Sequence, residues 1–118
     1  KLPANPSASD ENAVLIREGQ NILGKIKESD HVIAMEVEGE HIDSVELAKK
    51  IQYAFDTKSS TIDFVIGGSL GLSDEVKKRA DYGLSFSKLT FPHQMARIML
   101  LEQIYRAFKI NSGETYHK

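Results

Sequence analysis

Hydrophobic and polar residues along the chain follow two different periods. Apolar side chains between residues 9 and 26 recur three and four positions apart with charges between them, which predicts an amphipathic helix. The segment 31–37 is continuously apolar in its first half, as expected for a strand buried on both faces. The Glu-Gly-Glu sequence at 38–40 is predicted to end that strand.

A second helix and a second strand follow. Asp43, with Glu46 three residues later, is typical of a helix N-cap, and an apolar stripe continues from there to Phe55. Residues 61–66 form an apolar run that leads directly into the glycine-rich segment 67–71. This run is predicted to be a buried strand.

The last half of the chain repeats the same order. Ser73 precedes two acidic residues and is predicted to cap a short helix. Residues 82–87 alternate between apolar and polar and are predicted to form a third strand. Pro92 suits the first position of a last helix, which the Asn-Ser-Gly sequence at 111–113 ends.

This alternation of helices and strands predicts an α/β fold, with a mostly parallel sheet and helices on both of its faces. Residues 1–118 are expected to form a single domain. Ligands of such sheets bind beyond the carboxyl ends of the strands. Three segments are predicted to lie at that edge: 35–40, 67–71 and 86–91.

Composition narrows the class of protein. The chain is 41% hydrophobic and 27% charged and has no Cys, so it has no disulfide and no thiolate metal site. None of its four His residues forms a ligand pair at i, i+4 spacing, so no metal is expected. No apolar run is long enough to span a bilayer, so no membrane partner is expected. The absence of Cys is compatible with the reducing cytoplasm, where we expect the protein to act. The segment 1–6 contains two Pro and no Met, which suggests the interior of a longer protein.

Charge is unevenly distributed. The formal net charge is −2, which argues against a protein that simply coats nucleic acid. Residues 1–59 have 7 basic and 11 acidic residues, whereas residues 60–118 have 8 and 6. The C-terminal part is therefore the predicted anion-facing part, although a solvated basic helix explains it equally well. Arg106 and Lys109 share a helix face and are interpreted either as phosphate ligands or as solvated residues.

Two loop segments are candidates for ligand contact. The glycines that follow the strand at 61–66 allow backbone to approach a ligand, but they match neither a P-loop nor the dinucleotide fingerprint, and a tight turn is the alternative. The segment 86–93 has backbone groups suited to a purine edge between Phe and Leu walls; an ordinary strand-to-helix loop fits as well. The C-terminal Tyr116, His117 and Lys118 combine groups that contact nucleotides, whereas chain termini usually tolerate change.

Four segments resemble the SPOUT-type RNA methyltransferases: 64–71 (FVIGGSLG), 84–95 (LSFSKLTFPHQM), 102–110 (EQIYRAFKI) and 116–118 (YHK). The resemblance implies a trefoil-knotted α/β fold, from which the first strand and helix of the family are absent here. It implies a homodimer that binds S-adenosyl-L-methionine in the knot. It also implies methylation of N3 of a pseudouridine in 23S rRNA, with the ribosome as partner.

The resemblance also assigns site residues. The implied cofactor contacts are Met35, Gly67, Phe86, Ser87, Lys88, Leu89, Thr90 and Phe91. For catalysis we expect His117 to accept the N3 proton, Tyr116 to orient the base, and Arg106 to stabilise the developing oxyanion or hold phosphate. In the alternative, Tyr116 and His117 only bind RNA and the proton leaves to water.

The last helix is apolar over a wide arc. Met95, Ile98, Met99 and Leu100 are predicted to help form a two-fold interface, the alternative being a helix buried within its own subunit. A non-catalytic nucleotide-binding or regulatory α/β module is the alternative to an enzyme. A purely structural dimer domain is a third interpretation.

Overall fold

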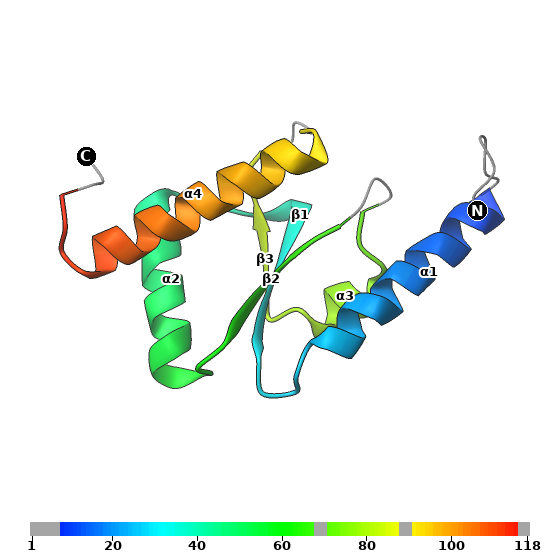
Figure 1. Cartoon of the computed structure of the whole chain (residues 1–118), viewed down its shortest axis with the longest axis horizontal. Coiled ribbons are helices and arrows are strands. Elements are labelled where there is room, and N and C mark those ends of the chain that lie inside the picture. Colours follow the sequence, from blue (N-terminus) through cyan, green and yellow to red (C-terminus); the bar gives the residue numbers. More distant parts are fainter. Residues whose placement is uncertain (1–7, 68–70, 88–90, 116–118) are drawn as a thin grey trace.

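The computed structural model describes residues 8–67, 71–87 and 91–115. Helices and strands alternate along the whole of this part of the chain (Figure 1). Their bounds are α1 (Ala8–Lys25), β1 (His31–His41), α2 (Ser44–Thr57), β2 (Ile62–Ile66), α3 (Asp74–Arg79), β3 (Tyr82–Ser85) and α4 (His93–Asn111). The predicted order of elements is therefore confirmed.

The strands form a parallel sheet in the order β2-β1-β3. Helices α2 and α4 cover one face, and α1 and α3 cover the other (Figure 1). All three strands point the same way, so the sheet has an amino edge, where they begin, and a carboxyl edge, where they end. The α/β class with a parallel sheet and helices on both faces is thus confirmed. The knot stays a prediction, because residues 68–70 and 88–90 on the path lie outside the described segments.

Each face of the sheet has its own apolar core. The core under α2 and α4 contains Ile33, Leu47, Ala48, Ile51, Leu84 and Ala107. The core under α1 and α3 contains Val32, Ala34, Val65, Leu72 and Val76. Successive residues of β1 from Val32 to Met35 alternate between the two cores, which is why these four positions are all apolar.

The prediction that β1 ends at the Glu-Gly-Glu sequence was wrong. The strand continues to His41, and its register shifts between Met35 and Glu40, so that Leu84 of β3 pairs with both of these residues. The bend presses backbone onto backbone: a Cβ on Gly39 would lie 2.7 Å from the carbonyl carbon of Gly83. Glycine thus lets β1 curve at the carboxyl edge instead of stopping there.

Two predicted helix caps are confirmed. The Oδ1 of Asp43 accepts a hydrogen bond from the backbone N–H of Glu46 at 2.8 Å, and Oγ of Ser73 accepts one from Val76 at 3.4 Å. Pro92 is the N-cap residue of α4, one position before the predicted one.

Candidate functional site

The carboxyl edge brings together the segments that were predicted to bind cofactor. Met35 lies opposite Ile66 of β2 on one side and Leu84 of β3 on the other. Gly67 directly follows Ile66, and Phe86 comes two residues after Leu84. Met35, Gly67 and Phe86 therefore gather at one edge of the sheet although they are far apart in sequence.

Gly67 lies close to Gly71, four residues later in the chain. A Cβ on Gly67 would lie 2.5 Å from the carbonyl oxygen of Gly71 and 2.6 Å from its carbonyl carbon. Gly71 has a φ of 84°, a conformation that favours glycine. Gly67 and Gly71, the described ends of this segment, therefore lie against each other, and any side chain at Gly67 would meet the backbone of Gly71.

The segment after β3 is only partly described. Ser85 is buried, and its Oγ donates a hydrogen bond to the carbonyl oxygen of Ser87 at 3.1 Å, which tightens the exit from the strand. Phe86, Ser87 and Phe91 are half-buried. The predicted contacts Lys88, Leu89 and Thr90 lie outside the described residues.

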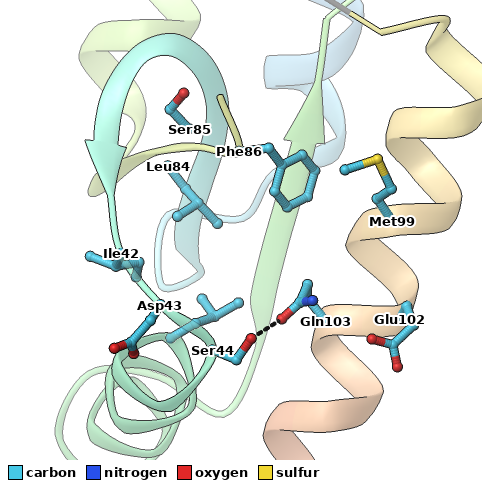
Figure 2. Close-up of a pocket in the computed structure, with 10 residues that line it drawn as sticks. Ile42, Asp43, Ser44, Leu84, Ser85, Phe86, Met99, Glu102 and Gln103 are labelled. Atoms are coloured by element: carbon cyan, nitrogen blue, oxygen red, sulfur yellow. Dashed lines mark hydrogen bonds between the residues drawn. The ribbon is translucent and has the colours of Figure 1, made fainter. Parts of the chain in front are cut away.

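A cavity of about 450 Å³ opens beside Phe86 (Figure 2). The turn between β1 and α2, the end of β3 and one side of α4 enclose it. Its lining residues are Ile42, Asp43, Ser44, Leu47, Leu84, Ser85, Phe86, Met99, Glu102 and Gln103. Across it, Ser44 Oγ donates a hydrogen bond to Gln103 Oε1 at 2.6 Å. The walls are thus mainly apolar, with two carboxylates, two hydroxyls and an amide among them.

Arg106 is held next to this cavity. Its Nε donates a hydrogen bond to Glu102 Oε1 at 3.1 Å, and Glu102 lines the cavity. Lys109 instead pairs with Glu114 at 3.1 Å, and this contact raises the pKa of Lys109. Both cations thus have carboxylate partners, although they were considered as a joint phosphate site. The other two predicted catalytic residues, Tyr116 and His117, lie outside the described segments.

The large pKa shifts within the described segments occur near the amino edge. Burial raises the pKa of Asp63 to about 6, and the neighbouring Asp30 adds to the shift. The hydrogen bond with Asp63 in turn lowers the pKa of Asp30. At the start of β3, burial raises the pKa of Tyr82 to about 12, with Glu40 contributing. The residues with strongly shifted pKa values, Asp63 and Tyr82, therefore do not line the cavity.

Sequence reasoning did not identify Ser44, Gln103 or Met99 as site residues. Ser44 and Gln103 are 59 positions apart, so no local pattern links them. The contact between Glu102 and Arg106 could have been predicted from the sequence, because residues four apart are neighbours on a helix. The cavity as a whole could be found only from the packing of α4 against the start of α2.

Helix α4 has an exposed apolar stripe, whose last member, Phe108, stacks on Phe55 of α2. Met95, Ile98, Leu101 and Phe108 are each at least half exposed, and Ile98 is 67% exposed. The prediction that Leu100 lies in the interface was wrong, because this residue is 4% exposed and packs inside its own subunit. Met99 is half-buried and lines the cavity. Only Met95 and Ile98 of the four predicted residues face outward.

Among the helices in the described part of the chain, none is long and apolar enough to cross a membrane. The same residues contain no group of three or more His, Cys, Asp or Glu side chains arranged to hold a metal ion.

Comparison with known proteins places this chain in a family. Residues 1–117 match the family described as "Predicted SPOUT methyltransferase". Proteins named "Ribosomal RNA large subunit methyltransferase H" from Clostridioides difficile (strain 630) and Clostridium botulinum (strain Kyoto / Type A2) are 54% identical over 118 residues. The protein of that name from Clostridium perfringens (strain 13 / Type A) is 55% identical over the same length. Each comparison covers 100% of this chain and 74% of the relative. The chain therefore belongs to the SPOUT methyltransferase family.

Proposed function

We propose that this protein transfers a methyl group from S-adenosyl-L-methionine to large-subunit ribosomal RNA, at N3 of a pseudouridine in 23S rRNA. The observation that carries the proposal is an identity of 54 to 55% with proteins named for ribosomal RNA methylation, extending over the whole chain. The family match over residues 1–117 supports the methyl-transfer chemistry.

The proposed cofactor site is the carboxyl edge. Met35, Gly67 and the segment 86–91 hold the cofactor there. Two features support this: the strand register gathers the described members of the set, and the turn at Gly67 leaves backbone rather than a side chain at the edge. When bound, the cofactor supplies an electrophilic methyl group. The chain's task is to hold the acceptor in line with it.

The acceptor nitrogen must lose a proton. The N3–H of a uracil ring is a weak acid, with a pKa on the order of 10, like a phenol. In our proposal His117 accepts this proton, Tyr116 orients the ring, and Arg106 stabilises negative charge on the ring carbonyl. Support for the last role comes from the position of Arg106, which Glu102 holds beside the cavity.

We also propose a homodimer formed through α4, acting in the cytoplasm on ribosomes. The exposed stripe of Met95, Ile98, Leu101 and Phe108 supports this, because one helix leaves four large apolar side chains at least half exposed. Light scattering at micromolar concentration is the test of the dimer. A monomer would contradict it.

The experiment that tests the reaction incubates the whole protein with tritiated cofactor and ribosomes. We expect label in 23S rRNA, and mapping of the modified base should identify N3 of a pseudouridine. Binding of S-adenosylhomocysteine by calorimetry without transfer would favour a regulatory module instead. If neither binding nor transfer is observed, the result would favour a structural dimer domain.

The role of the tail has its own test. Deletion of residues 116–118 should abolish transfer while leaving the affinity for S-adenosylhomocysteine nearly unchanged. His117→Ala separates the two interpretations of this residue. Loss of a base lowers the rate at saturating ribosome, whereas loss of an RNA contact raises the ribosome concentration required.

A further inference from the structure

We infer that the cavity beside Phe86 is the binding site for the nucleoside that receives the methyl group. This inference rests on the proposed function. The nucleoside inserts its ring between Phe86 and Met99 and is read by Gln103 and Asp43. Ser44 acts as a positioning residue for Gln103.

The position of the cavity carries the first step. Phe86 lines the cavity and also belongs to the segment proposed to hold the cofactor. Leu84, which also lines the cavity, pairs with Met35 at the carboxyl edge. A ring in the cavity is therefore adjacent to the cofactor edge, as a methyl acceptor must be.

Size and wall chemistry carry the second step. A volume of about 450 Å³ lies in the range of sites for small molecules. The Phe86 ring and the Met99 thioether come from opposite sides, one from the end of β3 and one from α4 (Figure 2). Aromatic and thioether groups make favourable contacts with flat rings, and an unstacked RNA base typically binds in this way.

The polar lining limits what can bind. Asp43 is a carboxylate that accepts hydrogen bonds and repels phosphate, whereas the charge of Glu102 is paired with Arg106. The ligand must therefore present N–H and O–H donors, so the base and ribose enter while phosphates stay outside. A nucleoside satisfies this condition, and a bare phosphate does not.

The same lining suits pseudouridine better than uridine. The ring of pseudouridine has two N–H groups, at N1 and N3, whereas that of uridine has only N3–H. Because N3 is the methylated atom in the proposed reaction, it must face the cofactor. N1–H then remains as a donor for a carboxylate, and Asp43 is the residue that we assign to it. Asp43 is exposed in the structure and would be covered by the bound nucleoside, so an acceptor left there without its donor would cost affinity, which is how the site would reject uridine.

Gln103 is already oriented for such a role. Its Oε1 accepts the hydrogen bond from Ser44 at 2.6 Å. Its amide Nε2 donates to no group within the described residues and is available for a ring carbonyl. The hydrogen bond from Ser44 fixes the amide plane before the ligand arrives, which lowers the ordering cost of binding.

The test compares variants of the whole protein in the ribosome methylation assay. Gln103→Leu should lower kcat/KM for ribosomes by about tenfold, because it removes both polar groups of the amide. Ser44→Ala should cause a smaller loss, about threefold, mainly through KM. Gln52→Leu is the matched control. It makes the same change on α2 and removes a side-chain hydrogen bond, the one that Gln52 donates to Asp56 at 2.9 Å, but Gln52 does not line the cavity. It should leave kcat/KM unchanged.

Two further measurements identify the occupant. The Kd for S-adenosylhomocysteine should stay within about twofold in Gln103→Leu, because the cofactor binds elsewhere. Asp43→Asn keeps a capping residue for α2, yet it should reduce the preference for ribosomes with pseudouridine over those with uridine by about fivefold.

The outcomes are distinct. Unchanged kcat/KM in Gln103→Leu overturns the inference while the proposed function stands. If the Kd for S-adenosylhomocysteine rises as much as the ribosome KM, the cavity holds the cofactor's adenosine and the inference is wrong. An unchanged preference in Asp43→Asn contradicts the role of N1–H. If the wild-type protein transfers no label, the proposed function is wrong, and this inference is then wrong as well.

Discussion

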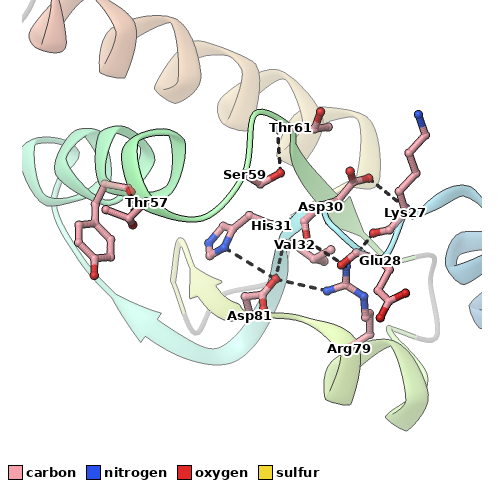
Figure 3. A network of polar contacts seen from close by, with 11 residues as sticks. Lys27, Glu28, Asp30, His31, Val32, Thr57, Ser59, Thr61, Arg79 and Asp81 are labelled. Atoms are coloured by element: carbon pink, nitrogen blue, oxygen red, sulfur yellow. Dashed lines mark hydrogen bonds and ion pairs between the residues drawn. The ribbon is translucent and has the colours of Figure 1, made fainter.

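The two edges of the sheet are built in opposite ways. At the amino edge, the guanidinium of Arg79 donates hydrogen bonds to the carbonyl oxygens of Lys27 at 3.0 Å and Asp30 at 2.9 Å (Figure 3). It also pairs with Asp81 at 3.3 Å, and Asp81 accepts a hydrogen bond from the backbone of Val32 at 2.8 Å. The carboxyl edge instead has glycine turns, a bent strand and a cavity.

This difference separates stability from ligand binding. The contacts at the amino edge join segments that are about fifty residues apart, so they fix how β1 and β3 begin. Strands fixed at one end can present loops at the other end without losing their register. A substitution at one edge should therefore change one measured property and leave the other unchanged.

Gly67→Val should have the largest effect on the carboxyl edge. Its Cβ would lie 2.5 Å from the carbonyl oxygen of Gly71, so the turn must open and distort the proposed cofactor site. We expect affinity for S-adenosylhomocysteine to fall by at least about a hundredfold, measured by calorimetry. Thermal unfolding should change much less than affinity. Unchanged affinity would show that this turn lies outside the cofactor site.

The turn at Gly67 shows how much the sequence could predict. The periods of apolar residues, together with the capping pattern at Ser73, identified all seven elements of the described part of the chain, and the parallel class followed from their order. The gathering of three segments at the carboxyl edge followed as well, because parallel strands end together. The bend of β1 was missed because a Glu-Gly-Glu sequence looks like a strand end, and only the contact of Gly39 with Gly83 reveals why the chain continues.

The cavity could not be predicted for a different reason. Ser44 and Gln103 have a hydrogen bond that depends on how α4 crosses the start of α2, and no sequence spacing encodes that crossing. The same holds for Leu100, whose burial depends on which side of an apolar helix faces inward. Local patterns predict elements; the choice between apolar faces is made by tertiary packing.

Arg79→Ala should have the largest effect on the amino edge. It removes hydrogen bonds to backbone carbonyls and the ion pair with Asp81, so we expect the free energy of unfolding to fall by about 2 to 3 kcal/mol in chemical denaturation. Affinity of the folded protein for S-adenosylhomocysteine should not change. Arg79→Lys keeps the charge but loses the planar fork, and it should recover only part of the stability. A matching loss of affinity would contradict the separation of the two edges.

Asp63→Asn tests the amino edge through pH. Oδ2 of Asp63 is buried and accepts no hydrogen bond from the described residues, and burial together with the neighbouring Asp30 raises its pKa and favours its protonated form. The folded-state pKa of about 6 lies above the ordinary value of 3.8. The stability that this proton supplies is therefore fully present below pH 3.8 and is lost as pH rises through about 6.

The lowered pKa of Asp30 has the opposite sign, and its contribution is lost only as pH falls below its ordinary value of 3.8. Of these two carboxyl groups, only Asp63 should therefore change the stability between about pH 5 and about pH 7.5. The amide introduced by Asp63→Asn stays neutral and can still donate to Asp30, so the variant should gain about 1 kcal/mol relative to wild type over this interval. Parallel stability curves for the two proteins would show that Asp63 does not titrate here.

Gly24→Ala should have the smallest effect, and it strengthens the amino edge instead of breaking it. Gly24 lies in the last turn of α1, just before the loop whose carbonyls Arg79 binds. No atom lies within 4 Å of the Cβ that alanine would add, so only helix propensity changes. We expect the free energy of unfolding to rise by about 0.5 to 1 kcal/mol. Affinity for S-adenosylhomocysteine should be unchanged, because a firmer amino edge does not alter the loops at the other end of the strands. If this variant bound the cofactor more weakly while unfolding at a higher temperature, the two edges would be coupled through α1, and the carboxyl edge would depend on freedom at the amino edge.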